Sequence, residues 1–446
     1  MQQIQRRTFL KDRRTFLKNV GAAAAPLLFT SDGWAGANDR IRMAIIGMGG
    51  RGRDHMNALS RIDGVEVAAF CDPDENRMSE LAAEFESRTG KRPRLEADLR
   101  RVLEDRSIDA VSIAAPNHWH ALAAIWGCQA GKHVYVEKPV AHDMAAGQMM
   151  VDAAKKYNRM VQGGTQRRSN PGIRRAIQAL HDGIVGDIYM ARCIHFQQRD
   201  SLGFKEPGAP PPNLHWDLWL GPGPKQPFHG NLAPYNWHWF WDFGNGELGN
   251  NGVHFIDVAR WGMKKTLPTG IHACGGRYGY KDQGQTPNTL TATYEFQDGS
   301  QLVCEIRGRF SNQEAAMSQG VFFYGSKGYM VIGPNGDATP QLFLGGSQQP
   351  DPGFAKSVTG DPRANLDRQH FQSFFDAIRA GKRELLTDEV TETYLSTAYC
   401  LLGNISCRLG RKLTFDPQKE KFAGDTQADG MLASEYRKPF NLPGKI

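Results

Sequence analysis

The stretch IRMAIIGMGGRG, residues 41–52, joins a short apolar run to a glycine-rich turn. The run predicts a strand over Ile41–Ile46, and the residues after the turn predict a helix over Arg53–Ile62. Six consecutive residues of the turn match the pattern GxGxxG: Gly47, Met48, Gly49, Gly50, Arg51 and Gly52. Between a strand and a helix, such glycines let the backbone turn tightly and approach a pyrophosphate at the helix N-terminus. This stretch therefore predicts the first turn of a Rossmann domain that binds a dinucleotide.

An acidic residue stands where such a domain needs one. Asp72 follows the apolar run Val65–Cys71 and lies twenty residues beyond Gly52. A carboxylate there accepts hydrogen bonds from the adenosine ribose hydroxyls and repels a 2′-phosphate. Asp72 therefore favours NAD over NADP, although Arg77 nearby is a side chain that can accommodate the phosphate.

Strand and helix patterns alternate up to about Thr165, as expected for a parallel sheet covered on both faces. The predicted helices are Asp74–Arg88, Asp98–Asp105, His118–Ala130 and Met144–Tyr157. The predicted strands are Val65–Cys71, Ala110–Ala115, His133–Val136 and Met160–Gln162. We assign residues 38–165 to the Rossmann domain.

The pattern then changes. A helix after Pro171 and a strand over Asp187–Phe196 precede a Gly-, Pro- and aromatic-rich stretch, residues 201–241. Residues 269–345 read as successive strands, with Asp298-Gly299 as a hairpin signal. Two helices (365–380 and 388–409), a strand over Lys412–Phe415 and a surface tail of thirty residues complete the pattern. Residues 166–446 therefore predict a C-terminal α+β domain with an open, mainly antiparallel sheet, in a chain of the α/β class.

Residues 1–37 predict an export signal rather than part of the fold. Arg13-Arg14-Thr15-Phe16-Leu17-Lys18 precedes the apolar run Val20–Phe29, and Ala35-Gly36-Ala37 supplies small residues for cleavage. The run is shorter than the about 20 residues that span a bilayer. The paired arginines resemble a twin-arginine signal, and Arg6-Arg7 repeats the pattern upstream. We expect an exported, periplasmic protein without a membrane anchor; a disordered basic tail is the alternative.

Composition excludes two classes of partner. The formal charge is +7, but without residues 1–37 the chain has 48 basic and 45 acidic side chains. This balance gives no reason to expect binding to nucleic acid or an anionic membrane. The seven cysteines are odd in number and lack a framework spacing, so we expect buried thiols without disulfides.

Three further motifs make the chain recognisable. Ala115-Pro116-Asn117-His118-Trp119-His120 follows the fourth strand, and Val136-Glu137-Lys138-Pro139 ends the fifth. The third motif runs from Gly244 to His254. Together with the glycine turn, they resemble the Gfo/Idh/MocA family of sugar and polyol oxidoreductases across nearly the whole chain after residue 37.

The resemblance implies two catalytic residues, Lys138 and His254. In the family, a lysine in the Glu-Lys-Pro triplet touches both nicotinamide ribose and substrate, and an Asp-x-x-x-His pair lies across the cleft. Here the pair is Asn250 and His254, so an amide replaces the acid. Asn250 can hydrogen-bond a hydroxyl but cannot serve as a base, which puts the family's usual proton relay in doubt.

The remaining candidates complete the expected site. We expect Asn250, His120 and Trp241 to contact substrate. Besides the glycine turn and Asp72, the expected cofactor contacts are Pro116, Asn117, His120, Glu137, Lys138 and Gln166. A zinc site at His118, His120 and His254 lacks a companion carboxylate or thiolate at ligand spacing, so no metal is expected. The aromatic rings of residues 216–241 suit sugar faces and loop packing about equally.

These residues predict an NAD(P)-dependent oxidoreductase that transfers hydride between the nicotinamide and a sugar, polyol or glycoside hydroxyl carbon. A glycosidase or lyase that uses bound NAD in an oxidation–elimination–reduction cycle is an alternative that export keeps open. A non-catalytic NAD- and sugar-binding protein is a second alternative, which Lys138 and His254 disfavour. We expect the exposed face of the open sheet to form a homodimer or homotetramer.

Overall fold

We analysed a computed structural model of the chain. It describes residues 40–309, 317–333, 340–358, 365–444 and 446. The predicted export signal, residues 1–37, lies outside these residues. The chain divides into residues 1–40 and 41–446, and the second of these units is the subject below. No helix within the described ranges has the length and hydropathy needed to cross a bilayer.

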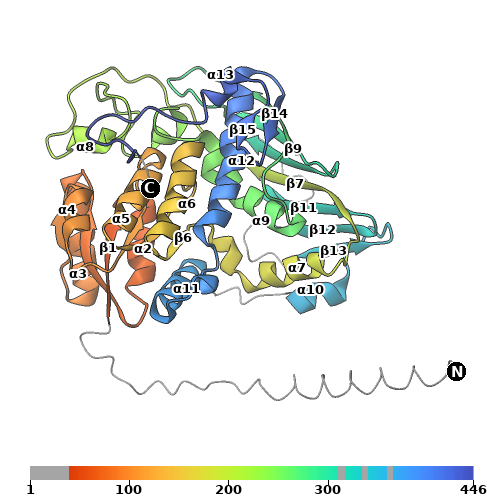
Figure 1. The fold of residues 1–446 in the computed structure, drawn as a ribbon, viewed down its shortest axis with the longest axis horizontal. Coiled ribbons are helices and arrows are strands. Elements are labelled where there is room, and N and C mark those ends of the chain that lie inside the picture. Colours follow the sequence, from red (N-terminus) through yellow and green to blue (C-terminus); the bar gives the residue numbers. More distant parts are fainter. Residues whose placement is uncertain (1–39, 310–316, 334–339, 359–364, 445) are drawn as a thin grey trace, which may run out of the picture. The chain divides into compact units, whose positions relative to one another are not determined.

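The first sheet is parallel and has the strand order β3-β2-β1-β4-β5-β6. Its strands are β1 (Ile41–Ile46), β2 (Val65–Cys71), β3 (Arg94–Glu96), β4 (Ala110–Ile113), β5 (His133–Val136) and β6 (Val161–Gly163). The helices between them are α2 (Gly50–Leu59), α3 (Glu75–Thr89), α4 (Leu99–Glu104), α5 (Asn117–Gln129) and α6 (Met144–Lys156). Figure 1 shows these helices packed against the sheet. The order reverses at β1, between β2 and β4, where doubly wound folds bind their ligands.

The predicted Rossmann fold is confirmed, and most of its elements end within three residues of the predicted bounds. β3 is the exception, because the sequence analysis missed it. It has three residues, all at least partly exposed, that pair with Ala69–Cys71 of β2. An edge strand without an apolar run carries no periodic signal, so only its pairing partner reveals it.

The second sheet has nine strands in the order β13-β12-β11-β7-β10-β9-β8-β14-β15. Its strands are β7 (Ile188–Phe196), β8 (Gly270–Gly276), β9 (Thr289–Glu295), β10 (Gln301–Arg307), β11 (Gln319–Gly325), β12 (Gly328–Ile332), β13 (Gln341–Leu344), β14 (Leu413–Asp416) and β15 (Lys421–Phe422). Neighbours are antiparallel except β7 and β10, which run parallel. The predicted open, mainly antiparallel sheet is therefore confirmed.

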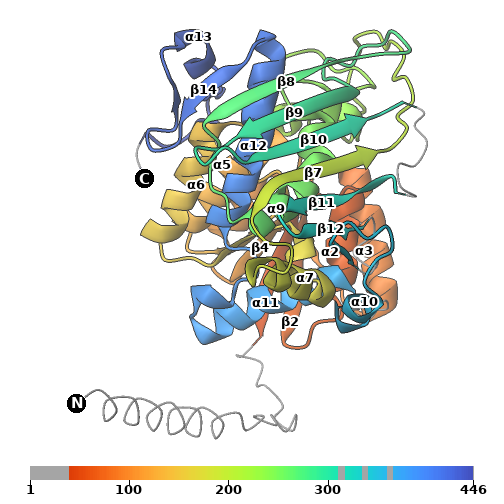
Figure 2. The ribbon, with the colours of Figure 1, turned by 90° about the vertical axis from the view of Figure 1, so that its right-hand side faces the viewer.

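Helices cover one face of this sheet, as Figure 2 shows for α9 and α12 behind the strands. The helices of this half are α7 (Pro171–His181), α8 (Trp216–Leu220), α9 (Val253–Met263), α10 (Pro352–Val358), α11 (Leu366–Ala380), α12 (Val390–Leu409) and α13 (Thr426–Asp429). α11 instead packs on the Rossmann half, where Phe371 stacks on Tyr135 of β5 with ring centroids 4.1 Å apart. The two halves thus share a core.

The prediction of a surface tail over the last thirty residues was wrong. β15 and α13 lie within it, and Leu432 and Phe440 are buried. The ring of Phe440 meets Trp119 of α5 edge-on at 5.4 Å, so this segment packs against the Rossmann half. Buried side chains in this segment are spaced irregularly, so its sequence shows no helical or strand period.

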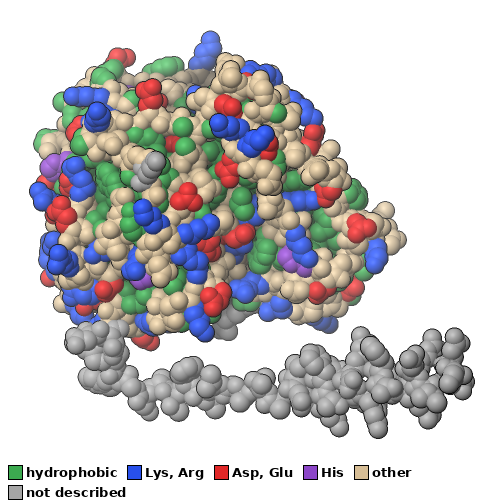
Figure 3. All heavy atoms as spheres, in the orientation of Figure 1, with side chains coloured by type: hydrophobic (Ala, Val, Ile, Leu, Met, Phe, Trp, Pro, Cys, Tyr) green, Lys and Arg blue, Asp and Glu red, His purple; other side chains and the backbone are tan. Residues whose placement is uncertain are grey.

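The distribution of charged side chains and the state of the cysteines can be compared with what the composition predicts. Basic and acidic side chains are interspersed on the face shown in Figure 3, and neither sign dominates there. All seven cysteines are free thiols. Five of them are buried, whereas Cys274 is exposed and Cys407 is partly exposed, so burial holds for most of them only.

Candidate functional site

The glycine turn between β1 and α2 forms an open cradle at the carboxyl end of the sheet. Gly47 has a φ of +90°, and a Cβ there would lie 2.6 Å from the carbonyl of Ala114. A Cβ on Gly52 would lie 2.0 Å from the Gly47 oxygen. Gly50 has no atom within 4 Å of its Cβ position, so space lies open beside the first turn of α2. Strand, loop and helix therefore approach closely around a free concavity.

Asp72 closes one end of this cradle. Its carboxylate accepts hydrogen bonds from the backbone N–H groups of Met48, at 2.6 Å, and Asp74, at 2.8 Å. Burial raises the pKa of Asp72 to about 6, although these two donors partly offset the effect. Each oxygen keeps a lone pair for a further donor, as a ribose hydroxyl requires.

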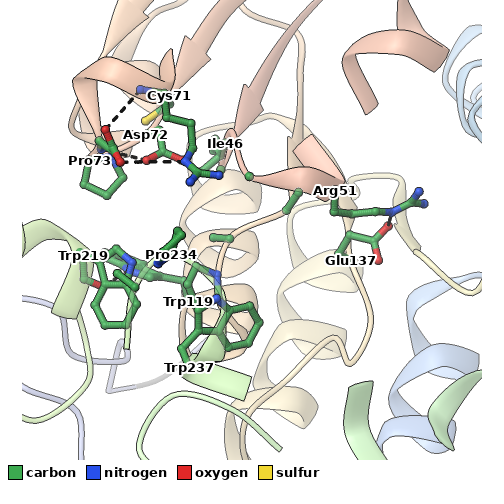
Figure 4. A pocket seen from close by; sticks show the side chains of 18 of the residues that line it. Ile46, Arg51, Cys71, Asp72, Pro73, Trp119, Glu137, Trp219, Pro234 and Trp237 are labelled. Carbon is green, nitrogen blue, oxygen red and sulfur yellow. Dashed lines mark hydrogen bonds and ion pairs between the residues drawn. The ribbon is translucent and has the colours of Figure 1, made fainter. Parts of the chain in front are cut away.

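A buried ion cluster lies at the other end of the cleft (Figure 4). Arg51 donates to Glu137 at 2.7 Å and makes two bonds to Asp367 of α11, at 2.9 and 2.7 Å. The His55 ring lies 3.1 Å from the same Glu137 oxygen. Burial by itself would raise the pKa of Glu137, but Arg51 and His55 hold it well below its ordinary value. Arg51 and Glu137 line the cleft, yet their charges neutralise each other.

Lys138 comes directly after Glu137 and joins the two halves of the molecule. Its ammonium donates to the backbone oxygen of Asn250 at 2.9 Å. Burial lowers the pKa of Lys138, while Glu137 opposes this shift. Both Lys138 and Asn250 line the cleft, as the sequence predicted. Because its carbonyl holds the lysine, Asn250 contributes backbone as well as side chain to the site.

His254 follows Asn250 across a π-helical turn, Leu248–Gly252, which leads into α9. The ring makes no hydrogen bond with the described residues, and its buried Nδ1 has no partner. Burial lowers the pKa of His254 well below its ordinary value, and the charges of Lys138 and Arg167 lower it further. The ring is therefore neutral near pH 7 and able to accept a proton or donate its N–H.

Both ring nitrogens of His120, a predicted substrate and cofactor contact, lie against backbone oxygens. Its Nδ1 lies 2.7 Å from the oxygen of Pro139, and its Nε2 lies 2.6 Å from that of Ala115. The buried ring thus ties the loops after β4 and β5 together while lining the cleft. Its partners are backbone carbonyls brought together by the parallel sheet, which the HxH spacing could not show.

The three histidines of the zinc alternative do not form a cluster. His118 is buried among Trp119, Trp219 and Phe243, and burial lowers its pKa to about 3. Its Nε2 lies 3.2 Å from the oxygen of Trp219. Within the part of the chain that the structure describes, no group of three or more His, Cys, Asp or Glu residues is arranged to hold a metal ion.

Two further candidates lie outside the lining of the cleft. Trp241 borders a second cavity and stacks under Arg408, whose Cζ lies 5.0 Å from the ring centroid. The chain turns between Phe240 and Gly244, which sends Phe240 inward and Trp241 to this other side. Gln166 donates to Asp367 at 3.2 Å and so buttresses the ion cluster. Trp241, a predicted substrate contact, and Gln166, a predicted cofactor contact, are therefore not among the residues that line the cleft.

Some of the other predicted cofactor residues line the cleft, and the rest are buried behind it. Gly47, Gly49, Gly50, Pro116 and Asn117 line the cleft with Asp72. Met48 and Gly52 are buried behind it. The Met48 side chain is in the core, so its N–H alone serves the site.

The sequence analysis missed a strap, residues 213–219, that crosses the Asp72 end. Leu214 pairs with Asp74 as a β-bridge, and the His215 N–H donates to the Pro73 oxygen at 2.9 Å. Asn213 receives the Glu75 N–H on its backbone oxygen at 3.0 Å and donates its side-chain amide to Asp74 at 2.9 Å. These residues come from a long irregular stretch, where no periodicity marks which ones return to the site.

Aromatic residues of the same stretch form the opposite wall. In Figure 4, Trp219, Pro234 and Trp237 lie across the cleft from Asp72 and Pro73. Trp219 and Trp237 also belong to a buried cluster with Phe240 and Phe243, so they both pack the loop and line the cleft. His238 stacks on Trp237 at 3.6 Å and lines the cleft, and burial lowers its pKa to about 3.

The cleft fits a nicotinamide dinucleotide. Asp72 can accept hydrogen bonds from the adenosine ribose hydroxyls, the open cradle at Gly50 suits the pyrophosphate, and Lys138 lies at the end of the cleft where chemistry can occur. These three features occur in the order that a bound dinucleotide requires at the switch point of a doubly wound sheet.

The chain is similar to characterised dehydrogenases. It is 33% identical over 172 residues to inositol 2-dehydrogenase 1 of Saccharopolyspora erythraea, covering 38% of this chain and 50% of the relative. It is 28% identical over 224 residues to levoglucosan dehydrogenase of Pseudarthrobacter phenanthrenivorans, covering half of each protein. The chain thus spans about half the length of these curated relatives.

Solved structures share the fold over most of both chains. The WlbA dehydrogenase of Bordetella pertussis, crystallised with NADH and UDP-GlcNAcA, superposes with a TM-score of 0.64 at 20% identity. The match covers 84% of this chain and 99% of that one. Aldose-aldose oxidoreductase of Caulobacter crescentus, complexed with glycerol, gives 0.63 at 19% identity, with 84% and 100% covered.

Family models match both halves. Residues 41–165 match the NAD-binding Rossmann fold of an oxidoreductase family, and residues 203–442 match the C-terminal alpha/beta domain of the same family. With the cradle, Asp72 and Lys138 in place, the chain belongs to the Gfo/Idh/MocA oxidoreductase family.

Proposed function

We propose that the protein is an NAD-dependent oxidoreductase acting on a hydroxyl of a sugar, polyol or glycoside. The observation that carries this proposal is the placement of Lys138. Its ammonium sits at the end of the dinucleotide cleft, on the Asn250 carbonyl, with the unpartnered His254 ring nearby. The curated relatives support the substrate class, because they are named for inositol and levoglucosan.

Two side chains can move the proton of the reacting hydroxyl. When bound, NAD supplies the acceptor for the hydrogen that leaves the hydroxyl carbon. Lys138, with its pKa lowered by burial, can hold the substrate oxygen, and neutral His254 can take the proton. Asn250 orients a hydroxyl but does not titrate. The proton path therefore uses His254 and Lys138 without the acid found in the family.

The strap formed by residues 213–219 favours a second candidate function. Hydrogen bonds hold residues 213–219 to Pro73–Glu75 across the Asp72 end, and we expect this strap to slow the release of a bound dinucleotide. A cofactor held in this way is best reused in place. That suits a redox-neutral cycle, in which transient oxidation of a sugar acidifies the neighbouring C–H and allows cleavage of a glycosidic bond.

One screen tests both candidates. We expect purified protein to oxidise a sugar, seen as nicotinamide absorbance, or to cleave a glycoside without added NAD. Lys138→Met and His254→Ala should each lower turnover by about 10²-fold or more, the scale of a lost acid–base group. Cofactor binding should survive in the His254 variant. Near-wild-type turnover in both variants would show that the proton moves by another route.

The cofactor preference rests on Asp72. Asp72→Ala should weaken NAD binding more than NADP binding, as measured by calorimetry, because only NAD offers two ribose hydroxyls to the carboxylate. The pKa of about 6 adds a pH dependence. Ribose donors favour the ionised carboxylate, so NAD affinity should rise as pH rises through about 6, and this rise should vanish in Asp72→Asn.

Asp98→Asn is the matched control for this measurement. Asp98 lines the same end of the cleft, but its carboxylate is held by Arg100 at 2.6 Å. The NAD affinity of the Asp98→Asn variant should stay close to that of the wild type. A wild type that prefers NADP would contradict the assignment of Asp72.

Export by the twin-arginine route is part of the proposal, with a mature chain that starts near Asn38. Replacing Arg6, Arg7, Arg13 and Arg14 with lysine should leave the precursor in the cytoplasm, as measured by fractionation and blotting. Replacing Lys11 and Lys18 with arginine is the charge-matched control and should not block export. Unchanged export of the four-lysine variant would exclude this route.

We also propose that the uncovered face of the large sheet forms a homodimer or homotetramer. On this face Ile194, Phe196, Phe322 and Val331 form a cluster bordered by partly exposed rings, among them Tyr329 stacked on Phe343 at 4.4 Å. Light scattering should show an oligomer at micromolar concentration, and Tyr329→Glu should shift it toward monomer. Tyr278→Glu, at an exposed ring outside this cluster, is the control. A monomeric wild type would refute the interface.

A further inference from the structure

Adjacent arginines in the 3-10 turn Gln166–Ser169 have different surroundings. Arg168 makes three hydrogen bonds to Asp257 of α9, between 2.8 and 3.1 Å, and lies 3.5 Å from Asp388. The guanidinium of Arg167 makes no hydrogen bond and no ion pair with the described residues. Arg168 is thus fully engaged in holding α9, whereas the side-chain donors of Arg167 are unused among the residues that the structure describes.

Arg167 is partly buried in spite of this. Its guanidinium lies over the ring of Phe255, 4.5 Å from the centroid, and Phe255 is the neighbour of His254 in α9. Burial lowers the pKa of Arg167 to about 10, and no acidic group counteracts the shift. A guanidinium without a charge partner is costly to bury even in part. A perturbed group of this kind beside His254 is a candidate for a functional role.

The acidic groups around the site are each held by another base. Glu137 and Asp367 are held by Arg51. Glu247, which lies near the start of α9, pairs with Arg199 at 3.0 Å and with the His195 ring at 3.2 Å. The family's acid at the position of Asn250 is absent from this chain. Lys138 and Arg167 both lie near His254, and none of these acids of the described residues is free to balance Arg167.

We propose that Arg167 binds the carboxylate of an acidic sugar, so that the substrate is a uronic acid or another carboxylated sugar or polyol. Arg167 and Lys138 approach α9 and its preceding turn from different loops, and the charges of both act on His254 at the start of α9. A single guanidinium with free donors matches a planar carboxylate of one charge, which it binds through two parallel hydrogen bonds. A phosphate dianion carries a second negative charge and would need hydrogen-bond donors beyond this one guanidinium. This inference rests on the proposed oxidoreductase function and narrows its substrate class.

Matched sugar pairs test the inference in the purified holoenzyme. We expect kcat/KM for glucuronate or methyl glucuronide to exceed that for glucose or methyl glucoside by about 10- to 100-fold, the scale of a charged hydrogen bond. Arg167→Met should reduce this ratio toward one, and Arg167→Lys should retain part of it. Arg174→Met removes an exposed arginine of α7 and should leave the ratio unchanged. Glucose 6-phosphate tests whether the ligand is a phosphate instead. A higher kcat/KM for glucose 6-phosphate than for glucuronate would overturn the carboxylate assignment.

A binding measurement separates this inference from the proposed function. Calorimetry with glucuronate on the Lys138→Met variant, with and without Arg167→Met, reports recognition without turnover. Loss of binding with Arg167→Met supports the subsite even if no sugar is oxidised. Lys138-dependent oxidation of neutral sugars with no gain for uronates would uphold the function and overturn the subsite.

Thermal unfolding tests the structural alternative, in which Arg167 serves only to pack Phe255. Methionine keeps the apolar stem over the ring and removes the unpaired charge. The melting temperature of Arg167→Met should therefore hold or rise. A fall of several degrees together with an unchanged substrate ratio would assign Arg167 to packing and overturn the proposal.

Discussion

The buried pair of Arg51 and Glu137 is the interaction on which the site depends. Arg51 comes from the glycine turn, Glu137 from the end of β5, and Asp367 joins them from α11. Glu137 is buried, whereas Arg51 is partly exposed, so loss of Arg51 would leave the Glu137 carboxylate with only the His55 ring beside it, which is costly for a buried charge. The pair therefore holds the dinucleotide cradle, the end of the parallel sheet and a C-terminal helix in one arrangement.

The position of Lys138 follows from this constraint. Because Glu137 is anchored, the next residue leaves the strand in a defined direction, and its ammonium meets the Asn250 carbonyl 2.9 Å away. His120 adds a second tie between the loops after β4 and β5. Glu137 and His120, predicted as binding residues, thus hold the loops, whereas the predicted catalytic residues Lys138 and His254 lie on either side of the Asn250 turn.

The charge balance of the cleft sets the chemistry available to it. The acids near the substrate end are each neutralised by a neighbouring base, and the amide at Asn250 removes the one that the family would add. Burial lowers the pKa of both His254 and Lys138, and the charges of Lys138 and Arg167 lower that of His254 further, which fits the proposed role of a neutral imidazole as proton acceptor. At the opposite end, hydrogen bonds from residues 213–219 hold the strap across the cleft.

Local sequence determined the Rossmann half and the cradle, because the apolar period of β1 and the glycines of residues 47–52 act over a few neighbouring residues. It also indicated Asp72 and Lys138, whose positions follow from strand ends, and Asn250, which was identified from its motif before α9. Only the tertiary structure decided the partners of His120, the diversion of Trp241 to a second cavity, and the return of residues 213–219 to the cleft. It likewise decided that Arg168 is paired and Arg167 is not. These outcomes depend on contacts between distant segments, and periodicity and spacing carry no information about such contacts.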